Sequence, residues 1–285
     1  MISGRSSRKI LLVLSDVDGS LLTPEKALTD RAARAVRALD DAGIAFAIAS
    51  SRPPRGLAML IAPLALKTPI AGFNGGVYVR PDMSVIESHT LDPDVARRIV
   101  DLILGDGLDA WVYTLNAWLI RDANAQHVAR ETSTVRFDAK VVSKFTDVHL
   151  AQAVKIVGVS DDRDRVVACE MKAQAELGKR ASVTRSQPYY LDVTHRQANK
   201  GMVVATLAKN LNIPVAQIAA LGDTSNDVLM FRGSGFSIAM GNASAEVKSQ
   251  ASAVTDTNEN DGFAKAMEKF ILARIEKSEN EDESR

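Results

Sequence analysis

Short apolar runs alternate with helical patterns at the start of the chain. An apolar run at 10–15 (ILLVLS) precedes a helical pattern that begins after Thr29 and ends near Gly43, and a second apolar run follows at 45–50 (AFAIAS). Short apolar runs predict buried strands, while threonine before a periodic segment and glycine after it are typical of helix ends. This alternation predicts parallel strands covered by helices.

The same alternation returns late in the chain. A helical pattern at 200–211, with Val204, Leu207 and Leu211 on one face, precedes the apolar run 218–222 (IAALG). Two further short apolar runs, FSIA and ASAV, are separated by another helical pattern. We therefore predict an α/β fold with a Rossmann-like parallel-sheet core domain.

The middle of the chain has a different pattern. Strand-like segments such as AWVYTL and AWLI mix with longer amphipathic helices, one of which is expected to begin at Ser160. We predict a smaller α+β cap domain at 91–189, inserted into a discontinuous core domain at 1–90 plus 190–285. The segment 276–285 (EKSENEDESR) has almost nothing to bury, so we predict a disordered tail there.

Composition and charge favour a small-molecule partner. The chain has 285 residues with 46% hydrophobic content, and Lys plus Arg balance Asp plus Glu at 35 each. A protein of this size can bury a large core, and a balanced charge provides no field for nucleic acid or an anionic membrane. We expect neither partner, and we expect a monomer or a small homo-oligomer.

Cysteine and histidine usage excludes two further classes of protein. Cys169 is the only cysteine, so no internal disulfide can form, and the four histidines lie too far apart in sequence for zinc-ligand spacing. The apolar run after the basic N-terminus is too short for a signal peptide or a membrane span. We expect a reducing, cytoplasmic location.

Polar residues gather where three predicted strands end. The segments are 16–20 (DVDGS), 50–53 (SSRP) and 222–227 (GDTSND). In an open α/β sheet, ligands bind beyond the carboxyl ends of the strands. The three segments therefore predict carboxylates, hydroxyls and an arginine at one edge of the sheet.

These residue types suit phosphoryl chemistry with magnesium. Mg²⁺ prefers oxygen ligands, so clustered aspartates without histidine or cysteine fit it better than zinc. A carboxylate beside such a cation stays ionised and can attack phosphorus to give an aspartyl-phosphate, while a second carboxylate two residues on can handle protons. Lys200, at the start of a predicted helix, can neutralise the charge of a phosphoryl group in transfer.

Taken in order, DVDGSLLT, SSR, the lysine of NKG and GDTSND resemble the four motifs of the phosphatases of the haloacid dehalogenase (HAD) superfamily. The insertion between the second and third motifs, with the stretch Phe73-Asn74-Gly75-Gly76, resembles the Cof-type branch, class IIB, which includes sugar-phosphate phosphatases. The likeness covers almost the whole chain, and the four motifs are specific only as a set.

The resemblance implies a role for each matching residue. It makes Asp16 the nucleophile, Asp18 the general acid and base, and Ser50 and Lys200 the groups that hold the phosphate oxygens. The implied metal is Mg²⁺, with Asp16, Asp18 (through its backbone carbonyl) and Asp223 as ligands. Asp227, with Asn226, is implied as a nearby ligand or as an anchor of the site. The implied substrate-binding residues are Ser50, Ser51, Arg52, Asn74, Gly75 and Lys200. Family members often carry threonine and glycine where this chain has Ser50 and Ser51, and Ser51 restricts the backbone more than glycine does.

Simpler explanations exist for each residue taken alone. Asp16 and Asp18 are also what an Asx-rich turn contains, and Ser50 is also a usual helix cap. Lys200 is also compatible with a solvated helix start, and Asn74 with a tight turn. The ordered occurrence of all four motifs favours the catalytic interpretation.

We therefore expect a Mg²⁺-dependent phosphohydrolase that cleaves small phosphomonoesters, a sugar phosphate or a similar metabolite, through an aspartyl-phosphate. The alternative within the superfamily is a phosphomutase or phosphotransferase, which shares the nucleophile. A non-catalytic phosphorylation switch is disfavoured, because receiver domains are much shorter and lack both the insertion and the second aspartate. The substrate itself depends on the inserted residues, which sequence alone does not place.

Overall fold

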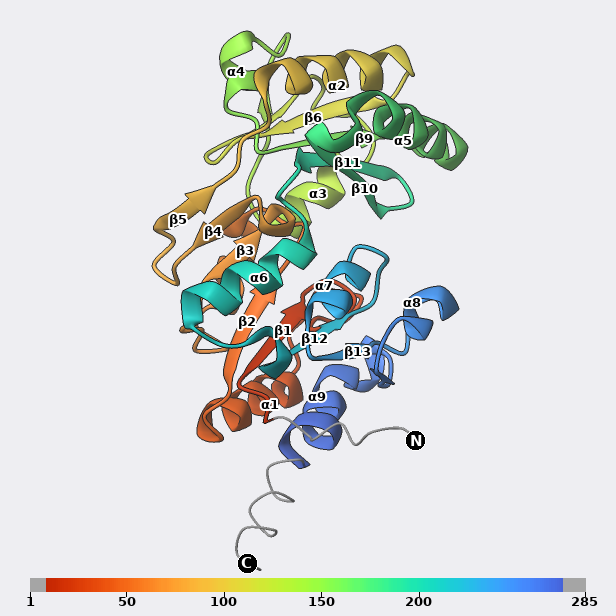
Figure 1. Cartoon of the computed structure of the whole chain (residues 1–285). Coiled ribbons are helices and arrows are strands. Elements are labelled where there is room, and N and C mark those ends of the chain that lie inside the picture. The colour runs from red at the N-terminus through yellow and green to blue at the C-terminus, as the bar shows by residue number, and fades with distance from the viewer. Residues whose placement is uncertain (1–8, 274–285) are drawn as a thin grey trace, which may run out of the picture. The chain divides into compact units, whose positions relative to one another are not determined.

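The computed structural model describes residues 9–273 (Figure 1). The chain forms two compact units: the described part of the first comprises 9–49, 59–69 and 200–273, and the second comprises 50–58 and 70–199. These limits differ from the expected cap at 91–189, because 70–90 and 190–199 contact the second unit more than the first. The domain limits stay a prediction, and the predicted tail at 276–285 lies outside the described residues.

The first unit contains a parallel sheet in the order β14-β13-β12-β1-β2. The strands β1, β2 and β12 carry mostly apolar side chains and are buried along almost their whole length, as expected when helices cover a parallel sheet. The predicted strands are confirmed to within two residues. Their bounds are β1 Leu12–Asp16, β2 Ala45–Ala49, β12 Ile218–Gly222, β13 Phe236–Ala239 and β14 Ala253–Val254.

The helices of this unit begin and end where the sequence indicates. In α1 (Asp30–Asp41), Thr29 is the N-cap and its side chain accepts a hydrogen bond from the backbone of Ala32, while Gly43 follows with a φ of +71°. The helix α6 spans Lys200–Leu211, as predicted. The shorter helices are α7 Val228–Gly233, α8 Ala245–Ser249 and α9 Gly262–Ala266, which continues as a wider turn over Met267–Leu272.

The second unit contains a six-stranded sheet in the order β10-β11-β9-β6-β7-β8, antiparallel except for the pair β7 and β8. The strands β3, β4 and β5 of this unit pair antiparallel in that order. The bounds are β3 Ile70–Gly72, β4 Val77–Val79, β5 Val85–Ser88, β6 Asp109–Tyr113, β7 Trp118–Ile120, β8 Lys140–Val141, β9 Lys155–Val159, β10 Ala181–Gln187 and β11 Tyr190–His195.

Apolar residues of α2 (Pro93–Gly105) and α5 (Arg163–Leu177) share one core with one face of the six-stranded sheet. The other two helices of this unit are α3 (Val128–Val135) and α4 (Asp147–Ala151). The helix expected from Ser160 begins instead at Arg163, because the side chain of Asp162 caps it by accepting from the backbone of Arg165. The sequence-based fold class is confirmed: within residues 9–273, an α/β fold has a main sheet of eight strands and a second, smaller sheet of six.

The register of the first sheet places two predicted motifs at one edge. Ser15 of β1 pairs with Leu221 of the parallel strand β12, so Asp16 and Gly222, the next residues along each strand, end at the same level. The carboxylates that follow these strands therefore lie close together. No helix within residues 9–273 is long and apolar enough to cross a membrane.

Candidate active site

A buried lysine joins two buried carboxylates at the carboxyl edge of the parallel sheet. Asp16 ends β1, Lys200 begins α6, and Asp227 precedes α7. The Nζ of Lys200 lies 2.5 Å from Oδ1 of Asp16 and 2.6 Å from Oδ1 of Asp227. Lys200 is therefore not a solvated helix-start residue, because its ammonium is buried between two anions that compensate for its desolvation.

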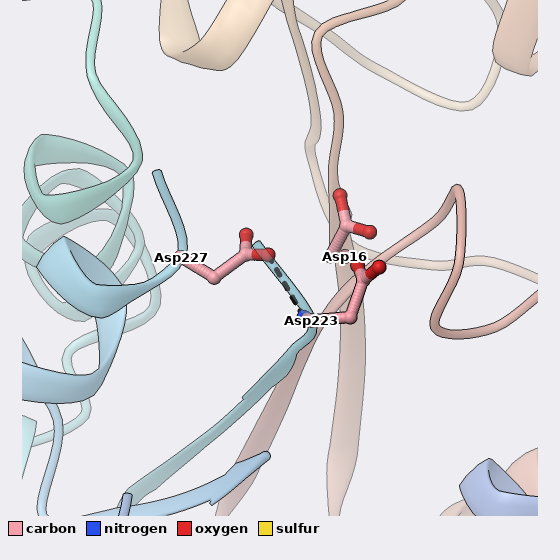
Figure 2. Close-up of side chains that lie close together, drawn as sticks. All are labelled: Asp16, Asp223 and Asp227. Carbon is pink, nitrogen blue, oxygen red and sulfur yellow. Dashed lines mark hydrogen bonds between the residues drawn. The ribbon is translucent and has the colours of Figure 1, made fainter. Parts of the chain in front are cut away.

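Asp223, just beyond β12, brings a third carboxylate to this position. Oxygen atoms of Asp16, Asp223 and Asp227 lie within 4.8 Å of one another, and the three side chains converge from two neighbouring strands and the loop before α7 (Figure 2). Lys200 supplies one positive charge against their three negative charges. The arrangement thus carries an excess of negative charge.

This excess of negative charge, together with burial, raises the pKa values of the carboxyl groups. Burial raises the pKa of Asp16 to about 7, and Asp227 adds to the rise while Lys200 opposes it. Burial likewise raises the pKa of Asp223 to about 8, together with Asp16 and Asp227. Burial alone lowers the pKa of Lys200, but Asp16 and Asp227 outweigh it and keep that pKa above its ordinary value. The ammonium is charged at neutral pH, and the carboxylates favour additional positive charge.

These residues fit a divalent, oxygen-seeking cation. The donors are carboxylate oxygens, with no histidine or cysteine among the three residues. Hard cations such as Mg²⁺ take oxygen ligands of this kind, and two positive charges offset the carboxylate excess left by Lys200. The cluster supports a divalent metal site.

Asp227 differs from Asp223 in the kind of donors that its oxygens accept from: a charged ammonium and two backbone N–H groups, where each oxygen of Asp223 accepts from one neutral side chain. Oδ1 accepts from Lys200, and Oδ2 accepts from the backbone N–H groups of Asp223 and Thr224 at 3.0 and 2.9 Å and from the Thr224 hydroxyl at 3.0 Å. The Thr224 hydroxyl also lies within hydrogen-bond distance of Oδ1 of Asn226, so its one hydrogen is shared between the two side chains. Asp227 therefore anchors the loop that carries Asp223.

The loop after β1 approaches Asp223 closely. Gly19 has a φ of +85°, and a Cβ atom there would lie 2.3 Å from Oδ2 of Asp223, so only glycine fits. Asp18 forms an ion pair with Lys26 at 2.7 Å, and the Asp18 side chain keeps 17% of its surface exposed. The second predicted catalytic carboxylate is thus partly open to solvent.

Three residues near the site were not predicted: Ser20, Lys26 and Asn242. Ser20 and Asn242 donate hydrogen bonds to the two oxygens of Asp223, and Lys26 pairs with Asp18. Asn242 follows β13, a fourth strand end, so inspecting the residues after the run FSIA in the sequence offers a way to find it. Ser20 lies in the predicted segment 16–20, but neither the strand end nor the motif gives it a role, and Lys26 has no signal of its own.

Apart from Lys200, the residues expected to bind the substrate and its phosphate lie in the second unit, where the structure brings them together. The hydroxyl oxygen of Ser50 accepts from the Arg52 backbone N–H at 3.1 Å, and the Ser50 carbonyl accepts from the Asn74 backbone N–H at 2.8 Å. Asn74 and Gly75 have φ values of +59° and +93° in a tight turn. The ammonium of Lys155 donates a hydrogen bond to the backbone carbonyl of Ser51 at 3.3 Å. The segments around Ser50 and Asn74 thus form one structural element.

Two side chains of this group have distinct environments. The guanidinium of Arg52 is buried and donates to the backbone carbonyl of Thr134 at 3.0 Å, so it also secures the end of α3. Asn74 is buried, and its side-chain oxygen has no hydrogen-bond partner among residues 9–273. A buried amide oxygen without a donor favours a polar ligand group.

The comparison with protein families decides the identity of the chain. The model of the haloacid dehalogenase-like hydrolases matches residues 13–267, which include all four motifs. The chain belongs to this family. Within it the chain is a phosphatase of the Cof-type branch, class IIB, as the sequence motifs predict.

Several curated relatives and solved structures resemble this HAD phosphatase along nearly its whole length. It is 26% identical to the 5-amino-6-(5-phospho-D-ribitylamino)uracil phosphatase YcsE of Bacillus subtilis, with 94% of this chain and 98% of that protein covered. Phosphatase YwpJ of the same organism is also 26% identical, with 91% and 99% covered.

Solved structures show the same fold. A haloacid dehalogenase-like hydrolase from B. subtilis has a TM-score of 0.82 at 25% identity, covering 92% of this chain and 100% of that one. The subclass IIB sugar phosphatase BT4131 has a TM-score of 0.79 at 19% identity, covering 91% and 98%.

Proposed function

We propose that this HAD phosphatase hydrolyses small phosphomonoesters, sugar phosphates or similar metabolites, through an aspartyl-phosphate on Asp16 with Mg²⁺ as cofactor. The observation that carries the proposal is the buried Asp16 carboxylate, 2.5 Å from the Lys200 ammonium and grouped with Asp223. This set supplies a nucleophile, hard ligands for a divalent cation, and a fixed positive charge for the phosphoryl oxygens.

The reaction takes two steps on this chain. In the first, a carboxylate oxygen of Asp16 attacks phosphorus, the bond from phosphorus to the leaving oxygen breaks, and the carboxyl group of Asp18 gives that oxygen its proton. In the second, a water molecule attacks phosphorus, passes a proton to the Asp18 carboxylate, and the bond to Asp16 breaks. Inorganic phosphate leaves, and both aspartates return to their starting state.

The remaining residues divide into metal, charge and anchoring roles. Asp16, Asp223 and the backbone carbonyl of Asp18 would hold Mg²⁺, which when bound neutralises negative charge on the phosphoryl oxygens. Lys200 neutralises further phosphoryl charge from its fixed position. We assign Asp227 to anchoring Lys200 and the loop of Asp223, because its oxygens accept from the Lys200 ammonium and from two backbone N–H groups of that loop. Asn226 stays a candidate metal ligand, because its side-chain oxygen shares only the hydrogen of Thr224.

We assign substrate binding to a further group of residues: Ser50, Ser51, Arg52, Asn74 and Gly75. Support comes from the hydrogen bonds that join the segments around Ser50 and Asn74, and from the unpartnered, buried oxygen of Asn74. That oxygen accepts a hydrogen bond and so suits a hydroxyl or amine of the substrate rather than a phosphate oxygen. The Ser50 hydroxyl, which can donate its hydrogen, suits the phosphate.

The substrate is best sought with a panel of phosphorylated metabolites. Three of the curated relatives are named for 5-amino-6-(5-phospho-D-ribitylamino)uracil, and another is an HMP-PP phosphatase from Cronobacter sakazakii. These compounds belong in the panel beside hexose and pentose phosphates, phosphoglycerates and nucleotides. A cytoplasmic location is part of the proposal, since such metabolites and an unpaired cysteine suit a reducing compartment.

The test measures phosphate release from the panel and from an aryl phosphate, with Mg²⁺ and with EDTA. We expect release that needs the metal and is lost in Asp16→Asn. Activity retained by Asp16→Asn would refute the nucleophile. A radiolabelled phospho-enzyme that decays in water supports hydrolysis, whereas one that decays only when a sugar phosphate is added would identify a phosphomutase or phosphotransferase instead.

A further inference from the structure

Asn242 joins three segments of the first unit at Asp223. Its Nδ2 donates to the backbone carbonyl of Gly19 at 2.9 Å and to Oδ2 of Asp223 at 3.2 Å, and its Oδ1 accepts from the backbone N–H of Asn258 at 3.1 Å. The second oxygen of Asp223 accepts from the Ser20 hydroxyl at 3.2 Å. Each oxygen of the carboxylate is therefore held by one neutral donor.

The orientation of the Asn242 amide follows from its partners. The carbonyl of Gly19 can only accept, and the backbone N–H of Asn258 can only donate. The NH₂ group must therefore face Gly19, and it then also presents a hydrogen to Asp223. If the amide were rotated by half a turn, its oxygen would face the carbonyl oxygen of Gly19 and Oδ2 of Asp223, and both contacts would be repulsive.

The turn that carries Asn242 is fixed to the sheet on both sides. The backbone N–H of Met240 donates to the Gly222 carbonyl at 2.9 Å, directly before Asp223, and that of Gly241 donates to the Asp256 carbonyl at 2.9 Å. A Cβ atom at Gly241 would lie 2.6 Å from the backbone nitrogen of Thr257, so this close approach needs glycine. Asn242 is thus presented to Asp223 by backbone contacts that do not depend on its own side chain.

We propose that Asn242 is a positioning residue that sets the carboxylate of Asp223, and the Gly19 turn beside it, for binding of the divalent metal. The proposal rests on the proposed function, in which Asp223 is a metal ligand. A carboxylate at position 223 without hydrogen-bond donors could rotate, and it would have to lose this freedom when the metal binds. Asn242 removes this freedom in advance, and a neutral donor does so without competing with the metal for charge.

The test compares two asparagine variants by isothermal titration of the full chain with Mg²⁺, without substrate. Asn242→Leu removes the amide N–H donors to Gly19 and Asp223, and the leucine side chain fills their space so that no water molecule can replace them. Asn260→Leu is the control, because its exposed side chain donates to the Thr257 hydroxyl in the same segment and not to Asn242 or Asp223. We expect the Kd for Mg²⁺ to rise at least about fivefold in Asn242→Leu and to stay within about twofold of wild type in Asn260→Leu.

The metal concentration for half-maximal phosphatase activity should rise in parallel, with the rate at saturating Mg²⁺ largely retained. Thermal unfolding in EDTA reports any general loss of stability in the two variants. An unchanged Kd in Asn242→Leu, or an equal rise in both variants, overturns the positioning role while leaving the proposed function intact. A wild-type chain that binds no Mg²⁺ overturns the metal part of the proposed function and this inference with it.

Discussion

The Nζ of Lys200 lies 2.6 Å from Oδ1 of Asp227, and both side chains are buried. Lys200 begins α6 and Asp227 precedes α7, so this ion pair fixes the ends of two helices and the loop that carries Asp223. The remaining oxygen of Asp227 accepts three further hydrogen bonds from that loop. Asp227 and Asp16 pair with the same lysine, yet we expect their replacement by asparagine to change the stability of the metal-free protein in opposite directions.

Asp227→Asn should destabilise the protein by about 3 kcal/mol. Four donors converge on the two oxygens of Asp227, and an amide offers only one oxygen, so its NH₂ group must face at least one of these donors. Urea unfolding measures the loss. Asp256→Asn, which breaks a surface pair with Lys265, is the control and should cost much less. Equal effects would contradict the anchoring role.

Asp16→Asn should raise the melting temperature of the metal-free protein, by a few degrees as an order of magnitude. It removes one of three clustered carboxylates, whose mutual repulsion and burial disfavour the charged form, while Lys200 keeps Asp227 as its partner. Thermal unfolding in EDTA measures this gain. Added Mg²⁺ should stabilise wild type more than the variant. A lower melting temperature in EDTA would show that the Lys200 pair matters more than the repulsion.

Much of this site could be predicted from the sequence because its residues follow directly on strands. Asp16 and Asp223 come immediately at the ends of β1 and β12, whose apolar runs are plain, and the parallel register brings such ends together. Lys200 was found from its motif at the start of a helix. Local patterns therefore locate residues whose position depends on one strand or helix.

Roles that depend on contacts between distant segments could not be predicted in the same way. The resemblance makes Asp223 a metal ligand but leaves Asp227 either a nearby ligand or an anchor. The structure adds the contacts: two neutral donors hold Asp223, whereas a lysine and a loop hold Asp227. Arg52 matches a motif position, yet its guanidinium also binds the carbonyl of Thr134, a residue remote in sequence. Such partners are set by how distant segments pack together, and hydrophobic periodicity predicts only the local helix or strand.

Gly19→Ala should abolish most of the activity while leaving the protein folded. The new Cβ would lie 2.3 Å from Oδ2 of Asp223, so the carboxylate must move away from its position. Gly43→Ala is the matched control, because Gly43 also has a positive φ but has no atom within 4 Å of an added Cβ. Each variant should lose about 1 kcal/mol from the backbone conformation, but only Gly19→Ala should lose phosphatase activity and weaken Mg²⁺ binding. Equal activities in the two variants would mean that the position of Asp223 is not critical.

Glu131 in the second unit should make stability depend on pH. Burial raises the pKa of Glu131 above its ordinary value of 4.5, although the Tyr113 hydroxyl, which donates to it at 2.7 Å, and Lys155 act in the opposite direction. As pH rises above about 4.5, the unfolded chain loses this proton first, so the free energy of unfolding falls until the folded carboxyl group has also ionised.

Glu131→Gln should remove this loss, because the amide oxygen can still accept from Tyr113 and carries no charge. The variant should gain stability relative to wild type as pH increases from about 5 to about 8, by an amount on the order of 1 kcal/mol. Urea unfolding at several pH values measures the difference, and Glu246→Gln, at an exposed position of α8, should show no such trend. A difference that shrinks as pH rises would mean that the charged form of Glu131 is the one the second unit stabilises, with Lys155 outweighing burial.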